Sequence, residues 1–394
     1  MKGVKCMNYF NLTYSSFLSG YMLTLKVPED ACKREAKCKH FGVCGGCSYQ
    51  HICYKDQLKM KKEFLEKLFE REIKIIPSPK EFFYRNKIEL VYAFNKLGLR
   101  EKGTYKRVVN LQECCLHSEK VKEMLPELHE LFKEHGIESY NYLRHEGYLR
   151  YVVLRHAKFS NQHMINFVTA NEAPTISKVA ESLKERFDSI VWSINSSKAD
   201  TSFGAVQQFW NSAHIEERFD DIKFRIGANT FFQNNSHVAL QIYRKIKERA
   251  SGKVLDLYAG CATISAFIAD NCDYVEAVEI NSEAIDYGHV NLHINDITNV
   301  ELLQQDVYAY LKHKQSLNFD YVILDPPRAG LERAFKHVLR LKPKNIIYLS
   351  CNPVVFRREL FFFKKFYKVS EMLAYDMFPQ TQHIELLCVL ERKD

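Results

Sequence analysis

The sequence predicts an α/β protein in which a Rossmann-like, doubly wound and mostly parallel sheet follows an α+β domain. From Lys223 onward, short apolar runs alternate with helical segments, which is the rhythm of βαβ units. Between Glu81 and Ile222, strand-like runs such as "IELVYAF" and "LRYVVLRH" alternate with helical ones. We therefore predict an N-terminal extension (1–37), a cysteine-containing α+β central domain (38–222) and the doubly wound domain (223–394).

The five buried-strand runs of the last part justify the parallel sheet. They read, in order, "KVLDLYAG", "YVEAVEI", "NVELLQQD", "FDYVILDPP" and "NIIYLSCNP". Each is rich in β-branched and apolar residues, and helical segments separate them. Because ligands of open α/β sheets sit beyond the carboxyl ends of the strands, the residues that end these runs are the candidates for function.

The first eighty residues carry most of the cysteine and most of the charge. Six of the twelve cysteines lie before residue 54. A secreted disulfide framework is usually small and loop-rich, so we expect reduced, cytoplasmic thiols with a metal or cluster site. Residues 1–80 hold 15 Lys and Arg against 8 Asp and Glu, so 15 − 8 = +7 of the net +8 lies there. Such asymmetry favours a polyanionic partner.

Two further observations concern the N-terminal region. Its longest apolar stretch, residues 6–25, is interrupted by polar side chains, so we expect neither a signal peptide nor a membrane span. Residues 54–72 predict an amphipathic basic helix with one apolar face, made of Leu58, Leu65, Leu68 and Phe69.

A nucleotide-like ligand is indicated at the first strand ends. The run "VLDL" leads into Tyr258 and Gly260, and Glu279 follows nineteen residues after that glycine, where its carboxylate can accept both hydroxyls of a ribose. Asp306 and Asp325 end the next two strands. The turn "DLYAGCATIS" lacks the GxGxxG fingerprint of dinucleotide sites, which favours a single nucleotide such as S-adenosylmethionine.

A carboxylate and a thiol should meet at the next two strand ends. Asp325-Pro326-Pro327-Arg328 ends one strand and Ser350-Cys351-Asn352-Pro353 the next. A thiolate that adds to carbon 6 of uracil makes carbon 5 nucleophilic toward a sulfonium methyl group, and a base must then remove a proton. We favour Glu385 as that base, with His383 as the alternative on the same face of a predicted strand.

These motifs resemble the RNA uracil-5-methyltransferases, whose catalytic domain is of the Rossmann-like class I type. The stretches that carry the resemblance occur in the family's order: "FFQNN", "VLDLYAG", "VEINSEAI", "LDPPRAGL", "YLSCNPVVFRREL" and "DMFPQTQHIE". The resemblance implies that Cys351 is the nucleophile and Glu385 the proton acceptor. It also implies a set of S-adenosylmethionine contacts, namely Gln233, Tyr258, Glu279 and Asp325.

The resemblance extends to an iron–sulfur segment, "CKHFGVCGGCSYQH". It implies a [4Fe-4S] cluster on Cys38, Cys44, Cys47 and Cys114, with Cys115 as an adjacent alternative to the fourth ligand. Zinc is the rival metal, although the spacing fits neither common zinc-finger pattern well. Cys32 and Cys53, which flank the trio, are interpreted as bystanders.

The sequence departs from the family in two places. Its first 37 residues are too few and irregular for the RNA-binding β-barrel of many members, and Ala262 stands where members usually have glycine, so that its methyl group would crowd the cofactor. RNA contacts would then come from the basic helix and the central domain. Two runs of that domain interleave aromatic with basic side chains, Arg85 and Lys87 in one, Arg150 and Arg155 in the other; they can bind phosphates and unpaired bases, or are equally ordinary amphipathic strands.

The predicted function is methylation of carbon 5 of a uridine in RNA, by a monomer. Ribosomal RNA of the 23S type is favoured as substrate. The alternatives are the same chemistry on the T-loop uridine of transfer RNA, or a non-catalytic iron–sulfur RNA-binding factor. Methylation of an amino group, which would not need Cys351, is a further alternative.

Overall fold

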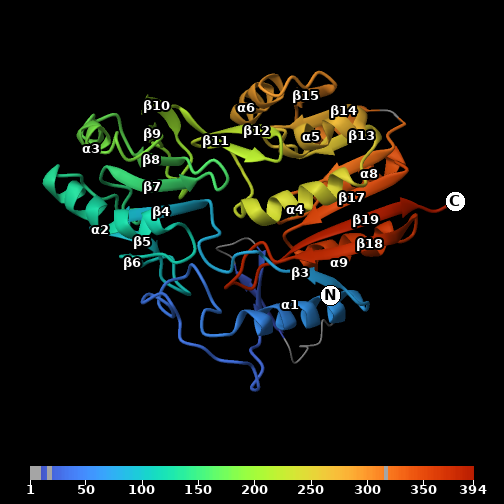
Figure 1. Ribbon diagram of the computed structural model, residues 1–394, viewed down its shortest axis with the longest axis horizontal. Helices are drawn as coiled ribbons and strands as arrows, with labels where there is room; N and C mark the ends of the chain where they lie inside the picture. Colours follow the sequence, from blue (N-terminus) through green and yellow to red (C-terminus); the bar gives the residue numbers. More distant parts are fainter. Residues whose placement is uncertain (1–9, 16–19, 315–317) are drawn as a thin grey trace. The chain divides into compact units, whose positions relative to one another are not determined.

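A computed structural model of the chain describes residues 10–15, 20–314 and 318–394, with side chains from Leu25 onward. These residues form two compact units (Figure 1). Unit 1 comprises residues 1–34, 51–79 and 238–394, and unit 2 comprises residues 35–50 and 80–237. The chain therefore leaves unit 1 after Arg34 and returns to it at His51. The three-part division at residues 37 and 222 stays a prediction.

Unit 1 is built on an eight-stranded sheet of order β15-β14-β13-β16-β17-β19-β18-β3. Strands β13 to β17 are mutually parallel, and β19 is antiparallel to both of its neighbours. The bounds of the strands are β3 (Lys74–Ile76), β13 (Gly252–Leu257), β14 (Cys272–Glu279), β15 (Val300–Gln304), β16 (Tyr321–Leu324), β17 (Asn345–Ser350), β18 (Tyr367–Tyr375) and β19 (Glu385–Arg392). The Rossmann-like fold and the five predicted parallel strands are confirmed. The strand order reverses beside β13, and such a switch point is where open α/β sheets bind ligands.

Helices separate the parallel strands as the βαβ pattern predicts. Figure 1 shows α1 and α9 side by side, and contacts between them confirm this. The bounds in unit 1 are α1 (Tyr54–Phe69), α4 (Ser236–Lys247, whose first two residues belong to unit 2), α5 (Thr263–Ile268), α6 (Ser282–His293), α7 (Val307–His313), α8 (Phe335–Leu341) and α9 (Pro353–Phe363). Three of these helices begin at side-chain caps that their sequences supply, at Asn281, Asp306 and Asn352.

The buried face of α1 differs from the predicted one. Leu65 and Phe69 are buried as expected, whereas Leu58 and Leu68 are only partly buried. Two polar residues, Gln57 and Lys61, are buried on this helix instead. The periodicity of leucines alone could not reveal this, because polar partners from a distant part of the chain decide it.

Unit 2 contains a seven-stranded sheet of order β10-β9-β8-β7-β4-β5-β6 and a separate hairpin, β11-β12. Helices α2 and α3 pack on the sheet through a core that includes Leu128, Phe132, Val179 and Phe167. The bounds are β4 (Lys87–Ala93), β5 (Lys96–Arg100), β6 (Val108–Asn110), α2 (Glu119–Glu134), β7 (Leu149–His156), β8 (His163–Thr169), α3 (Ile176–Ser182), β9 (Ser189–Ile194), β10 (Ala205–Trp210), β11 (His214–Phe219) and β12 (Ile222–Gly227). The predicted α+β character of this region is confirmed.

The N-terminal part of unit 1 holds an antiparallel hairpin, β1 (Phe10–Ser15) and β2 (Gly20–Leu25). Cys32 and Cys53 form a disulfide, which the expectation of uniformly reduced thiols missed. Their sequence separation is 21, and the chain between them carries Cys38, Cys44 and Cys47. No helix among the described residues is long and apolar enough to cross a membrane.

Candidate active site and cysteine cluster

The turn after β13 is open at its glycine. Tyr258 and Gly260 both have positive φ angles, 65° and 57°. A Cβ atom built on Gly260 would meet no heavy atom within 4 Å, so this backbone can be approached closely by a ligand. The turn is held to β14 by a hydrogen bond from the Gly260 N–H to Glu279 Oε2 at 3.0 Å.

Glu279 is oriented by backbone donors at the end of β14. Besides Gly260, the N–H groups of Ile280 and Asn281 donate to its Oε1, both at 2.8 Å. A carboxylate has about four acceptor positions, so three donors leave room for a hydroxyl. The half-buried side chain therefore has the orientation and the free acceptor capacity that a ribose contact requires.

Ala262 does not crowd this turn with its methyl group. It is fully buried, with a φ of 57°, and a Cβ built on Gly288 of α6 would lie 3.6 Å from the Ala262 Cβ. The methyl group is thus directed at α6, where a glycine leaves space for it. The expectation of crowding at the cofactor face finds no support in this packing.

Asp325, Arg328, Cys351 and Glu385 gather at the neighbouring ends of β16, β17 and β19. In the antiparallel pairing of β17 with β19, Ser350 is opposite Leu386, so the next residues outward are Cys351 and Glu385. Asp325 directly follows β16, the other neighbour of β17. Topology therefore places the predicted nucleophile, the predicted base and the carboxylate of the DPPR motif at one edge of the sheet.

Burial and neighbouring charges shift the pKa values of Cys351 and Glu385, and Asp325 and Arg328 are among those charges. Burial raises the pKa of the Cys351 thiol to about 12, and Glu385 adds to the rise, whereas the Arg328 cation opposes it. Burial also raises the pKa of Glu385 well above its usual range, with Asp325 adding and Arg328 opposing. The raised pKa of each group favours its protonated form, whereas the nearby Arg328 cation favours its ionised form.

Local sequence fixes Cys351 at the start of a helix. Asn352 caps α9 by accepting a hydrogen bond from the Val355 N–H at 3.4 Å. Pro353 follows in the first helical turn, where the N–H group that proline lacks would have no acceptor within the helix. The Asn352 side-chain amide also donates to the Arg328 backbone oxygen at 3.0 Å. The thiol thus stands at the positive end of the α9 dipole, which favours a thiolate.

His383 does not share a strand with Glu385. Strand β19 begins at Glu385, and His383 lies in the preceding loop, where its N–H donates to Thr381 Oγ1 at 3.2 Å and its ring contacts Phe378. The prediction that His383 and Glu385 lie on the same face assumed that both belong to one strand, and His383 lies outside β19. Glu385 is the residue that the structure brings to Cys351.

The cysteines predicted to hold a cluster lie together within unit 2. Burial raises the pKa of Cys44 to about 11 and that of Cys47 to about 12, and the other thiols of the set, including Cys38 and Cys114, add to both. The Gln50 side chain joins two of them, because its amide donates to Cys47 Sγ at 3.2 Å and accepts from the Cys38 N–H at 3.1 Å. A [4Fe-4S] cluster is held by four thiolates, and the four predicted ligands are buried or half-buried thiols of this one unit.

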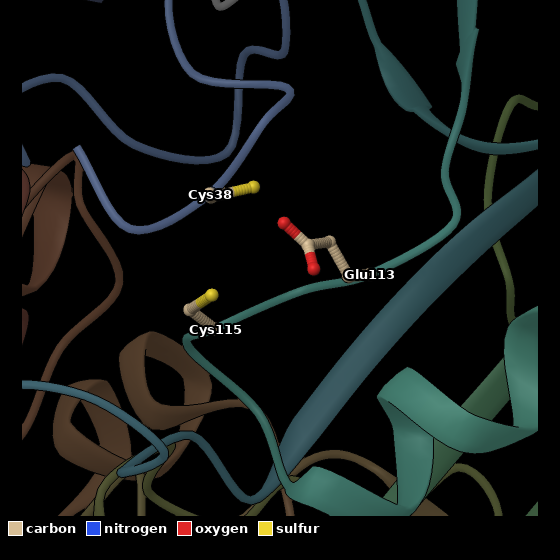
Figure 2. A group of neighbouring side chains, drawn as sticks. All are labelled: Cys38, Glu113 and Cys115. Atoms are coloured by element: carbon tan, nitrogen blue, oxygen red, sulfur yellow. The ribbon is translucent and has the colours of Figure 1, made fainter.

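Cys115 lies beside Cys38 and Glu113. A hydrogen bond with the Cys115 thiol lowers the pKa of Cys38 to about 7. Figure 2 shows these two thiols and the Glu113 carboxylate turned toward a common space, and their ligand atoms lie within 4.8 Å of one another. Cys114, by contrast, adds to the raised pKa of both Cys44 and Cys47. Both adjacent cysteines are therefore available, with different partners.

Comparison with known proteins places the chain. A family model described as "tRNA (Uracil-5-)-methyltransferase" matches residues 53–393. The chain belongs to this family. It is accordingly an S-adenosylmethionine-dependent RNA uracil-5-methyltransferase, so the alternatives of an amino-group methyltransferase and a non-catalytic factor are set aside.

Relatives in this family act on two kinds of RNA. The tRNA (uracil(54)-C(5))-methyltransferase of Pyrococcus abyssi is 38% identical over 357 residues, which cover 90% of this chain and 85% of the relative. The 23S rRNA (uracil(747)-C(5))-methyltransferase of Pyrococcus horikoshii is 32% identical over 362 residues, 91% of this chain and 85% of that one. A crystal structure of the Pyrococcus abyssi tRNA enzyme with S-adenosyl-L-homocysteine matches with a TM-score of 0.78 and 34% identity, covering 96% of this chain and 91% of that one.

Other predicted positions of this methyltransferase lie in unit 2. Gln233 accepts a hydrogen bond from the Asn86 side-chain amide on its backbone oxygen at 2.6 Å, and its contact with the cofactor stays a prediction. Arg150 and Arg155 are only 2% and 3% exposed and donate to backbone oxygens, among them Ser197 and Thr230. These two arginines hold loops in place, so the expectation that they bind RNA phosphates was wrong.

Sequence reasoning assigned no role to Arg328. The structure identifies it as the cation that opposes proton retention by both Cys351 and Glu385. The signal was present in the motif DPPR, where a fixed charge stands four residues after Leu324, the last residue of β16. Its effect on two groups elsewhere in the chain became visible only with the pairing of β16, β17 and β19.

Proposed function

We propose that this methyltransferase modifies carbon 5 of the T-loop uridine of transfer RNA through a covalent adduct with Cys351. The observation that carries the chemistry is the pairing of β17 with β19, which brings Cys351 and Glu385 together at a buried strand edge. Thiol addition followed by proton removal needs one nucleophile and one base at such an edge. Both are supplied by this chain.

The reaction begins with Cys351. Its Sγ forms a bond to carbon 6 of the uracil ring, and the electron pair of the ring's 5,6 double bond becomes an enolate that is nucleophilic at carbon 5. When bound, S-adenosylmethionine supplies an electrophilic methyl group on its sulfonium sulfur. The bond between this sulfur and the methyl group breaks as the methyl group passes to carbon 5, and S-adenosyl-L-homocysteine is the product. Carbon 5 then carries both the new methyl group and its original proton.

Glu385 completes the reaction by accepting that proton. The electron pair of the carbon–hydrogen bond restores the 5,6 double bond, and the bond between carbon 6 and Cys351 Sγ breaks, which regenerates the thiolate. A carboxylate with a raised pKa is a stronger base than an exposed one, so burial of Glu385 suits this step. Arg328 and the N-terminus of α9 favour the ionised forms that the two steps require.

Four residues are proposed to hold the cofactor. Glu279 would accept the ribose hydroxyls, and the open backbone at Gly260 would allow a close approach. Tyr258 and Asp325 follow the two strands on either side of the switch point, where a nucleotide is expected. A contact of Gln233 with the cofactor stays a prediction from the sequence resemblance.

Transfer RNA is proposed over the ribosomal RNA that the sequence favoured. The relatives named for uracil 54 of transfer RNA reach 38% and 39% identity, whereas those named for uracil 747 of 23S rRNA reach 32% and 33%. The structure match at a TM-score of 0.78 is also to a tRNA enzyme. The preference for ribosomal RNA therefore has less support than its alternative.

We further propose that Cys38, Cys44, Cys47 and Cys114 hold a [4Fe-4S] cluster. When bound, such a cluster would tie residues 35–50 to the segment that follows β6, and both segments belong to unit 2. The four thiols support this role by their burial and mutual electrostatic contact. Cys115 stays the alternative fourth ligand and zinc the alternative metal.

The function is tested by giving anaerobically purified protein methyl-labelled S-adenosylmethionine and, separately, unmodified transfer RNA and unmodified 23S ribosomal RNA. After digestion, labelled 5-methyluridine from transfer RNA supports the proposal. The same nucleoside from ribosomal RNA alone would overturn the choice of substrate. A labelled nucleoside other than 5-methyluridine would overturn the chemistry. The Cys351→Ala variant serves as the control for label that does not depend on the adduct.

A further inference from the structure

Helix α1 buries two polar side chains that the proposed reaction does not use. Gln57 is 0% exposed and Lys61 is 1% exposed. They are four residues apart, so they lie one above the other on the same face of the helix. A fully buried lysine is rare because its charge must be desolvated, and burial lowers the pKa of Lys61. Such a residue needs specific partners.

The partners lie in the loop that joins β18 to β19. Lys61 Nζ donates to Asp376 Oδ1 at 2.6 Å and to the Phe378 backbone oxygen at 3.2 Å. Gln57 makes a two-way contact with Gln380, since its Nε2 donates to Gln380 Oε1 and its Oε1 accepts from the Gln380 N–H, both at 2.9 Å. Two side chains of α1 thus make four hydrogen bonds to three residues of one loop.

This loop ends at the proposed base. Asp376 is the first residue after β18, and Glu385 is the first residue of β19. Gln380 has a φ of 68°, an uncommon conformation for a residue other than glycine, which its contact with Gln57 helps to hold. Hydrogen bonds continue the anchorage toward Glu385, because the Thr381 hydroxyl donates to the Phe378 oxygen at 2.8 Å and accepts from the His383 N–H at 3.2 Å.

Stability alone does not call for a charge at this position. Replacing a buried ion pair by apolar side chains of similar volume is often neutral or stabilising, because the pair must be desolvated. What the pair and the amide contact add is a defined geometry, since each bond requires one position of the loop. The defined position is transmitted to Glu385, which stands opposite Cys351.

We propose that Lys61 and Gln57 are positioning residues for methyl transfer, which set the place of the Glu385 carboxyl by fixing the loop at Asp376 and Gln380. This inference rests on the proposed function, in which Glu385 removes the proton from carbon 5. It predicts that a less firmly held loop slows proton removal by Glu385, while Cys351 still adds to the uracil ring.

The test replaces the pair as a unit. Lys61→Met combined with Asp376→Leu leaves no unpaired buried charge, so the double variant should fold with a melting temperature near that of the parent protein. Its kcat should fall by about 100-fold with KM little changed, since a displacement of about 1 Å at a reacting group has that effect. RNA labelled with tritium at carbon 5 of uridine should release tritium more slowly in the same proportion, and the covalent RNA adduct should accumulate.

A control removes a more exposed ion pair elsewhere in unit 1, whose side chains are 29% and 6% exposed against 1% and 0% for Lys61 and Asp376. Lys314 Nζ lies 2.6 Å from Glu276 Oε1, between the end of α7 and β14. Lys314→Met with Glu276→Leu should leave kcat and tritium release unchanged. Gln57→Ala, which leaves both charges in place, provides a second test should the first double variant not fold, with the same slowing of tritium release expected.

The outcomes separate this inference from the function on which it rests. If the parent protein releases no tritium and forms no adduct, the proposed function fails. If the parent protein turns over and the variants at Lys61 and Gln57 release tritium at the parent rate, the function stands and the positioning role is overturned. Adduct accumulation in these variants and not in the Lys314 control supports the positioning role.

Discussion

The side-chain amide of Asn352 donates a hydrogen bond to the backbone oxygen of Arg328 at 3.0 Å, and this bond joins the two loops that carry the reactive edge of the sheet. Cys351 is the neighbour of Asn352, and Asp325 precedes Arg328 by three residues. The same asparagine caps α9. One side chain therefore sets both the start of the helix and the distance between the two motifs.

Substitution of Asn352 separates these two roles. Asn352→Ser keeps an oxygen for the cap but loses the bond to Arg328, so stability should stay near the parent value while kcat falls roughly tenfold. Asn352→Ala should lose the same activity and, in addition, about 1 kcal/mol of unfolding free energy. Denaturant unfolding and single-turnover methylation measure the two effects. Parent-like kcat in the serine variant would show that the bond between the loops is dispensable.

The charge of Arg328 should be visible in the pH dependence of Cys351. The folded thiol has a raised pKa, about 12, so its alkylation by iodoacetamide should become faster as pH rises through 7 to 9, because only the thiolate reacts. Arg328 lowers that pKa, so Arg328→Gln should raise it and slow alkylation at every pH in this range. Since Arg328 is exposed and screened, we expect a factor of about three to ten.

The control for this experiment is Arg333→Gln, which removes another exposed arginine of the segment after β16. Mass spectrometry after digestion measures the alkylation rate of the peptide that contains Cys351 separately from those of the other cysteines. Equal alkylation rates for the parent and the Arg328→Gln protein would remove the argument that this cation favours the thiolate.

The adjacent cysteines 114 and 115 should respond differently to substitution. Cys114→Ser should abolish cluster assembly, because Cys114 is the proposed fourth ligand and adds to the raised pKa of both Cys44 and Cys47. Cys115→Ser should still bind about four iron atoms per chain after anaerobic reconstitution. Iron and sulfide analysis with visible absorbance measures both. Retained iron in Cys114→Ser with loss in Cys115→Ser would reverse the assignment, and zinc in place of iron would replace the cluster.

Much of the catalytic domain could be predicted from the sequence because its signals are local. Apolar runs identified β13 to β17, and the polar residue that ends each run identified the edge where Glu279, Asp325 and Cys351 lie. The cap at Asn352 followed by Pro353 is likewise a local signal for the start of α9. For these features, the strand order of a doubly wound sheet supplies the remaining information.

What the sequence did not reveal depends on contacts between distant residues. Lys61 reads as one lysine of a basic helix, yet Asp376, far along the chain, buries it. Arg150 and Arg155 read as phosphate ligands, yet backbone oxygens of later loops satisfy them. Cys32 and Cys53 read as bystanders, yet they form a disulfide. In each case the residue type fits both the expected role and the observed one, and only the residue that it contacts in the folded chain distinguishes the two roles.

The assignment of residues 35–50 to unit 2 likewise depends on contacts between distant residues. No composition change marks Arg34 or His51 as a boundary, because the segment is defined by its contacts with the central residues and not by its own pattern. The predicted break at residue 37 therefore lies close to one end of this segment without identifying its other end.

The central claim is that Cys351 and Glu385 act in sequence on one uridine, and a trapped intermediate tests it most directly. Glu385→Gln protein is incubated with S-adenosylmethionine and unmodified transfer RNA, and the mixture is separated on a denaturing gel. We expect a protein–RNA band that persists under denaturing conditions and is lost when Cys351→Ala is added to the variant. Bound RNA with no such band in Glu385→Gln, or a band that survives the loss of Cys351, would contradict it.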